Sequence, residues 1–158
     1  MKKKLVWLSV VMLSLLVLSL VSACASALPD QLTESKKLWE SQKLQDYDFT
    51  LERQCFCPED WRGPVDIQVR NGSAVSVIYV SDGTDVPEER FGDVDTIDKL
   101  FALLGNAYSG DGDFAEPAES VTVDYDSEMG YPVNLYIDES QLIADEEQGY
   151  AVTNLVER

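Results

Sequence analysis

The chain has 158 residues, with 12 basic and 29 acidic side chains, no histidine and a formal net charge of −17 at pH 7. This length suits one domain, and so acidic a surface repels polyanions, which argues against nucleic-acid binding. The lack of histidine removes Ser–His and Cys–His nucleophile pairs, so no catalytic residue is assigned.

The first 23 residues have the layout of a secretory signal peptide. Lysines at 2–4 precede an apolar run over 5–21, and small residues follow. The sequence Val21-Ser22-Ala23-Cys24 resembles the bacterial lipoprotein signal, in which an aliphatic residue and two small residues precede a lipidated cysteine. The resemblance implies that Cys24 becomes the first mature residue and anchors the chain to a lipid bilayer. The alternative is an uncleaved membrane helix, for which this apolar run is short.

Anchoring at Cys24 makes residues 24–30 a lipidated tether and residues 31–158 a single domain. Removing residues 1–23 takes three lysines and no acidic residue, so the mature charge is 9 − 29 = −20. Ala25 stands where an aspartate would resemble an inner-membrane retention signal. We therefore expect a chain in the outer membrane, facing the periplasm or the extracellular side, whose charge mainly serves solubility.

The spacing of apolar residues predicts two helices. Over 28–44, Leu28, Leu32, Ser35 and Trp39 form one narrow stripe. A second helix over 95–108 is predicted from a repeating apolar face, with Asp95 or Thr96 at its start and Gly110 after its end. The apolar positions of this second helix are Ile97, Leu100, Phe101, Leu104 and Tyr108.

Alternating apolar residues predict six strands, three after each helix. The first three lie at 47–57, 64–70 and 74–80, with a hairpin turn at Asn71-Gly72. The others lie at 119–126, 131–138 and 149–157. Residues 58–63 and 81–95 are predicted to be polar connections. The order α-βββ-α-βββ predicts an α+β fold: an antiparallel sheet of about six strands with two helices packed on one face.

The same residues resemble a bacterial domain-of-unknown-function family of secreted proteins and lipoproteins. The resemblance covers about residues 38–155, and it implies a shape and a location but no reaction, cofactor or catalytic residue. The residues that carry it are Tyr47, Phe49, Cys55, Cys57, Val65, Val69, Asn71-Gly72, Thr96-Ile97, Leu100-Phe101, Tyr125-Asp126, Gly130-Tyr131-Pro132, Asp138 and Asp145-Glu146.

With Cys24 assigned to lipid, Cys55 and Cys57 remain as an even pair in an oxidising compartment, which favours a disulfide. In a regular strand their Cα atoms would be about 6.6 Å apart, near the upper limit for such a bond, so a bulge or a strand end is required there. A reduced buried pair, a metal site and a thiol-redox centre stay open as alternatives.

A weaker candidate site is the run Asp124, Asp126 and Glu128, which begins like a calcium-binding loop. Its glycine falls at the seventh position and its twelfth residue is not glutamate, so a solvated hairpin turn is the better interpretation. We expect a non-enzymatic envelope module, with an unknown envelope protein as possible partner. A thiol-redox protein using Cys55 and Cys57, or a divalent-cation-binding domain, are the alternatives.

Overall fold

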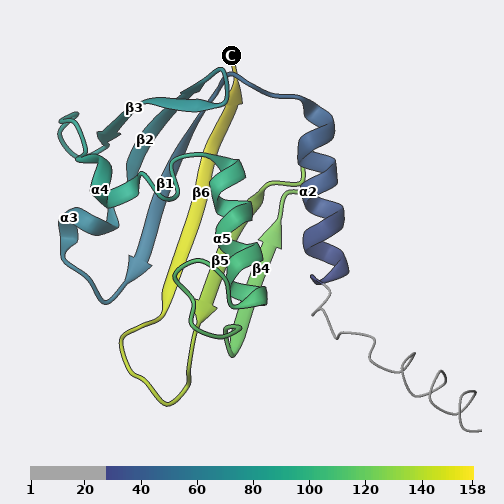
Figure 1. Cartoon of the computed structure of the whole chain (residues 1–158). Coiled ribbons are helices and arrows are strands. Elements are labelled where there is room, and N and C mark those ends of the chain that lie inside the picture. Colours follow the sequence, from purple (N-terminus) through teal and green to yellow (C-terminus); the bar gives the residue numbers. More distant parts are fainter. Residues whose placement is uncertain (1–27) are drawn as a thin grey trace, which may run out of the picture.

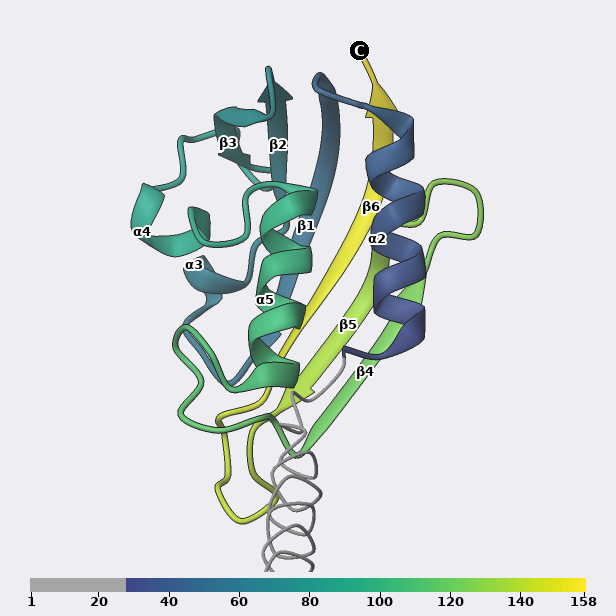
Figure 2. The same ribbon diagram turned by 45° about the vertical axis from the view of Figure 1, so that its right-hand side comes forward.

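In the computed structural model, residues 28–158 are described, and six strands form one antiparallel sheet in the order β3-β2-β1-β6-β5-β4 (Figure 1). The two long helices, α2 and α5, lie on one face of this sheet (Figure 2). The predicted α+β class is therefore confirmed. The elements are α2 (Asp30–Gln42), β1 (Tyr47–Cys55), α3 (Glu59–Arg62), β2 (Val65–Arg70), β3 (Ser73–Tyr79), α4 (Glu88–Phe91), α5 (Ile97–Ser109), β4 (Ser120–Tyr125), β5 (Pro132–Asp138) and β6 (Gln148–Glu157).

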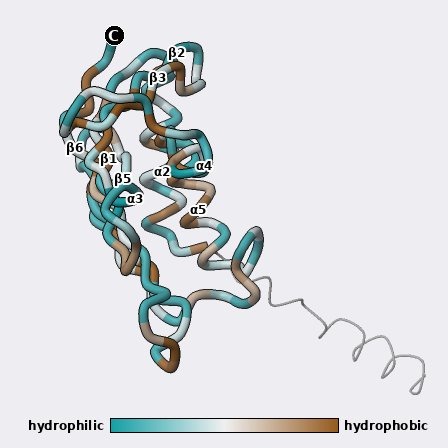
Figure 3. Tube along the Cα trace, turned by 90° about the vertical axis from the view of Figure 1, so that its left-hand side faces the viewer, coloured by the Kyte–Doolittle hydropathy of each residue, from teal (hydrophilic) through white to brown (hydrophobic). Residues whose placement is uncertain are grey.

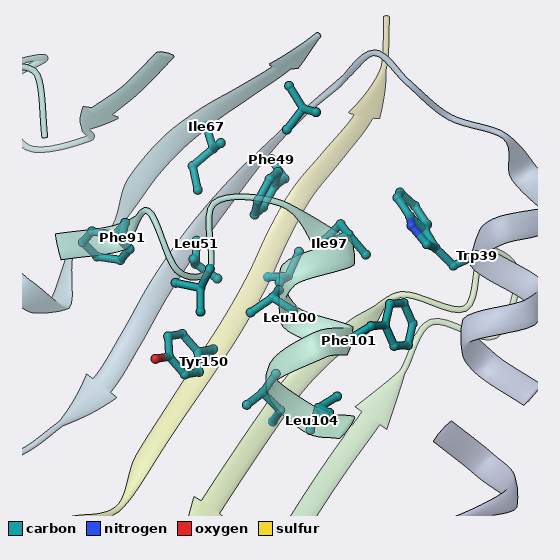
Figure 4. Close-up of a cluster of buried hydrophobic side chains, with 14 of the residues drawn as sticks. Trp39, Phe49, Leu51, Ile67, Phe91, Ile97, Leu100, Phe101, Leu104 and Tyr150 are labelled. Carbon is teal, nitrogen blue, oxygen red and sulfur yellow. The ribbon is translucent and has the colours of Figure 1, made fainter. Parts of the chain in front are cut away.

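Helix α5 follows its predicted stripe through Leu104 and forms the centre of the core, but its last buried residue is Ala107, and the predicted Tyr108 is only partly buried. The Thr96 hydroxyl caps its first turn by accepting a hydrogen bond from the Lys99 N–H at 3.2 Å, and Gly110 ends it with a φ of 74°. The buried face of α5 packs against side chains from the sheet (Figure 4). That face consists of Ile97, Leu100, Phe101, Leu104 and Ala107.

Helix α2 is held to the rest of the fold through Trp39. The Trp39 ring meets the Tyr47 ring edge-on, with centroids 5.3 Å apart, and its Nε1 donates to Asp98 Oδ1 at 3.3 Å. The Tyr47 hydroxyl oxygen accepts a hydrogen bond from the Ile97 N–H at 3.1 Å. Burial raises the pKa of Tyr47, so its hydroxyl stays neutral in this core. These contacts join α2, β1 and α5.

Among residues 28–158, no helix has both the length and the apolar character needed to cross a membrane.

Two segments predicted as irregular connections contain short helices. Within 58–63 the structure has α3, and within 81–95 it has α4, whose Phe91 is buried together with Val94. Each helix follows a proline, Pro58 or Pro87, and has acidic residues in its first turn. Four residues are too few to show a helical period, which is why the sequence pattern missed both helices and their contribution to the core.

Different strand ends and loops lie at the two ends of the sheet. At the paired end, β1 begins and β6 stops, since Tyr47 pairs with Glu157. At the tip end, β1 stops beside the loop 139–147 that joins β5 to β6, since Cys55 pairs with Gln148. The β4–β5 turn lies away from the tip end, because Ile137, near the end of β5, pairs with Gln148. Gln42, the last residue of α2, donates a hydrogen bond to the Glu128 carbonyl in this turn. Helix α2 therefore ends near that turn and starts toward the tip end (Figures 1 and 2).

Candidate functional site at the Cys55–Cys57 pair

The Cys55–Cys57 pair lies at the tip end, where β1 stops and the chain bends away from the sheet. The sulfur atoms are at disulfide distance, and the Cα atoms are 5.3 Å apart. Disulfides join Cα atoms roughly 4.4–6.8 Å apart, whereas a regular strand would separate these two by about 6.6 Å. Because β1 ends at Cys55, the two Cα atoms come closer than a continuing strand would allow. The strand predicted over 47–57 therefore stops two residues early, and this supplies the strand end that a bond between the two cysteines requires.

The surface beside the pair is an open cleft of about 360 Å³, lined by Cys55, Phe56, Cys57, Pro58 and Arg62. Both cysteines are half-buried, whereas the Phe56 side chain is exposed. Pro58 comes immediately before α3, and Arg62 belongs to the last turn of that helix. The pair is therefore reachable from solvent, with one aromatic ring and one cation next to it.

Behind the pair, the Arg53 side chain is only 9% exposed and lies among three aromatic rings. Its guanidinium carbon is 5.0 Å from the ring centroid of Phe91, 5.3 Å from that of Tyr150 and 6.0 Å from that of Trp61. Its Nη2 donates to Asp93 Oδ1 at 3.3 Å, while its Nε has no hydrogen-bond partner within the described residues. Cation–π contact of this kind stabilises a desolvated guanidinium. Arg53 thus holds together β1, α3, α4 and β6 behind the cysteine pair.

The sequence pattern did not single out Arg53, so this buried role was missed. A signal was present, because Arg53 continues the alternation of Tyr47, Phe49 and Leu51, which all face the core. Burial raises the pKa of Tyr150, and the Arg53 guanidinium beside it opposes this rise without cancelling it. The Arg53 guanidinium is therefore already surrounded by aromatic rings and Asp93. We interpret Arg53 as a residue that stabilises the fold next to the cysteine pair.

The acidic candidate Asp124, Asp126 and Glu128 does not form a metal-binding group. The Asp126 carboxylate accepts hydrogen bonds from the Glu128 N–H at 2.9 Å and the Met129 N–H at 2.7 Å, so it closes the β4–β5 turn. Over residues 28–158, no three side chains of His, Cys, Asp or Glu gather in a way that could hold a metal ion. Cys24, the predicted lipidation site, lies outside the described residues, as does the whole segment 1–27.

The comparisons with known proteins place these features in a family without a known activity. A family model described as "Family of unknown function (DUF6174)" matches residues 31–157, which include α5, all six strands and all of α2 except Asp30. A search of curated proteins found no match. The site therefore has to be interpreted from its own chemistry: a cysteine pair at disulfide distance, an exposed ring between the two cysteines, and a caged arginine behind them.

Proposed function

The chain belongs to the DUF6174 family, and we propose that it is a lipid-anchored, non-enzymatic binding or assembly module of the cell envelope. The observation that carries this proposal is the sequence Val21-Ser22-Ala23-Cys24 at the end of a signal-peptide pattern. In this reading Cys24 is acylated and holds the folded domain at the membrane surface. A multiply acylated cysteine is a strong anchor, because each buried methylene contributes about 0.8 kcal/mol.

The position of the folded domain supports the same reading. Helix α2 begins at Asp30, six residues after Cys24. Domain and candidate anchor are therefore adjacent in the sequence, joined by a short tether. The net charge of −20 after residue 23 (9 − 29) suits a soluble domain displayed beside a membrane.

Intact mass of the membrane-extracted protein tests the anchor directly. We expect a chain that has lost residues 1–23 and gained the mass of acyl groups at its new first residue. The matched control is Cys24→Ala, which we expect to keep its signal segment and gain no lipid. An unmodified chain that still contains residues 1–23 would contradict the proposal and favour the uncleaved membrane helix.

The binding role needs a separate experiment. The acylated chain, captured from detergent-solubilised envelopes after mild cross-linking, is expected to retain one envelope protein in a fixed ratio. Cys24→Ala serves as the control for acylation, because its domain is the same but it carries no lipid. Recovery of the chain alone, together with measurable turnover of a substrate, would contradict a non-enzymatic module.

A thiol-redox function is the second candidate, and one observation favours it. The Cys55 and Cys57 sulfur atoms are at disulfide distance beside an open cleft, so a small thiol or a cysteine-containing peptide could reach them. Its test is the reduction potential of the pair together with insulin-reductase activity, with the double variant Cys55→Ser/Cys57→Ser as control. A potential well below that of the glutathione pool, with no reductase activity, would leave the pair as a structural clip.

A further inference from the structure

Three large apolar side chains are exposed together at the tip end. Phe56 is 81% exposed, Leu142 is 95% exposed and Ile143 is 59% exposed. Phe56 follows β1, whereas the other two belong to the loop 139–147, so two separate segments contribute. Figure 3 shows a hydrophobic segment at the end of the loop that extends furthest from the rest of the domain. Leu142 and Ile143 are adjacent in one loop, and large exposed apolar residues that lie together indicate an interaction surface.

The backbone of the loop 139–147 is held in place by hydrogen bonds to carboxylates. Glu146 accepts hydrogen bonds from the N–H groups of Glu139 and Ser140, and Glu119 accepts one from the Gln141 N–H at 2.7 Å. The apolar residues are thus presented by a fixed loop base. Leu142 and Ile143 lie largely in solvent, which folding alone does not favour.

Phe56 is presented in a similar way by the cysteine pair. Because the sulfur atoms of Cys55 and Cys57 approach each other, these two side chains share one side of the bend. The side chain between them points the other way, and Phe56 is accordingly the exposed member of the three. The paired cysteines therefore fix the direction of an aromatic ring at the tip end.

The length of chain before α2 identifies what this end faces. Asp30 is six positions after Cys24, and a fully extended chain of that length spans at most about 20 Å. Because α2 starts toward the tip end, acylated Cys24 can bring this end to the surface of the bilayer. The anchor at Cys24 would therefore place these exposed side chains near a lipid surface, which makes that surface the expected partner.

We propose that Phe56, Leu142 and Ile143 form a membrane-docking tip, whose side chains enter the interface of the bilayer that carries the anchor. This inference rests on the proposed lipidation of Cys24. Insertion is shallow, because the loop also carries carboxylates that stay in water. The same carboxylates repel anionic head groups, so the tip prefers a zwitterionic surface. They belong to Glu139, Asp145, Glu146 and Glu147.

The test uses tryptophan as a depth probe in the full acylated chain. Leu142→Trp and Val156→Trp each add one indole at an exposed apolar position, the first at the tip end and the second near the paired end, where Val156 pairs with Asp48. Both proteins are reconstituted into vesicles of phosphatidylcholine brominated in its acyl chains. After subtraction of the unsubstituted protein, we expect bromine to quench the Leu142→Trp emission at least threefold more than the Val156→Trp emission.

Flotation of the same samples separates this inference from the function on which it rests. Chains that do not float with vesicles would overturn the lipid anchor, and the docking tip with it. Chains that float but show equal quenching for Leu142→Trp and Val156→Trp would overturn the docking tip alone, and would leave the exposed side chains for an envelope protein. Flotation with selective quenching of Leu142→Trp, weakened when anionic lipid is added, is the expected result.

Discussion

Charged side chains are arranged differently at the two ends of the sheet: opposite charges pair at one end, and like charges gather at the other. At the paired end, the Asp48 carboxylate accepts hydrogen bonds from Arg70 and Arg158, both at 2.7 Å. At the tip end, Asp138 and Glu139 lie among other acidic side chains. Burial raises the pKa of Asp138, and the charges of neighbouring glutamates raise it further. Burial and the charge of a neighbouring glutamate also raise the pKa of Glu139.

This difference separates what stabilises the fold from what the fold displays. Opposite charges at the paired end favour the folded state, whereas like charges and exposed apolar side chains at the tip end oppose it or leave it unchanged. A surface that folding does not favour calls for another explanation, and docking to the membrane is the one that the position of α2 supports. Substitutions at the two ends should therefore differ in both size and sign.

The largest effect is expected at Gly130, in the β4–β5 turn beneath α2. Its φ is 84°, and a Cβ there would overlap the Ser35 carbonyl oxygen and the Leu38 side chain. Gly130→Ala should lower the free energy of unfolding by about 3 kcal/mol, because the left-handed backbone and the steric overlap both add to the cost. Urea denaturation measures it. The matched control is Gly83→Ala, where φ is 73° and the space is open, so only the backbone cost of about 1 kcal/mol is expected.

The next effect is at Asp48, where the hydrogen bonds from Arg70 and Arg158 outweigh burial and lower the pKa of the carboxyl. Asp48→Asn should cost about 1 kcal/mol at pH 7, because the pair is partly exposed and screened. A carboxyl with a lowered folded-state pKa contributes stability above its unfolded pKa of about 4 and loses it as the pH falls further. The difference between wild type and variant should thus shrink from pH 7 to pH 3. A difference of equal size at both pH values would contradict this ion pair.

At the tip end, Asp138→Asn is expected to act in the opposite direction. Because the pKa of Asp138 is raised, its protonated form is favoured in the folded state, and this favourable contribution is lost as the pH rises through the folded-state pKa. The variant should therefore be more stable than wild type at pH 7, and this advantage should disappear at pH 3. Parallel melting curves at the two pH values measure it. A loss of stability at pH 7 would show that the acidic cluster does not strain this end.

The sequence predicted the elements with clear periods, and much less of the site. The long helices, the six strands and the Asn71-Gly72 turn follow from local patterns that burial then confirms. The helices α3 and α4 were missed because four residues show no period. The cage around Arg53 was missed for another reason: Trp61, Phe91 and Tyr150 lie far apart in the sequence, and only the packing of three elements brings them together.

The exposed apolar residues at the tip end also could not be predicted as neighbours from the sequence. Phe56 lies between the two candidate cysteines, and Leu142-Ile143 lie between the strands predicted at 131–138 and 149–157, so none of the three was a candidate site residue. That they lie at one end of the sheet depends on the pairing of β1 with β6, in which Cys55 meets Gln148. Strand order is a non-local property, so an alternating pattern alone could not predict this neighbourhood.

The smallest expected effect on stability is therefore the most informative about the tip. The double variant Leu142→Ser/Ile143→Ser should change the free energy of unfolding by less than about 0.5 kcal/mol, because these side chains are mostly in water and make little core contact. The matched control is Leu104→Ala in the core of α5, which should cost about 3 kcal/mol. Urea denaturation of both variants decides the comparison. A loss above 1 kcal/mol for the double variant would mean that the loop residues support the fold. A near-zero loss would leave them for the proposed membrane-docking tip.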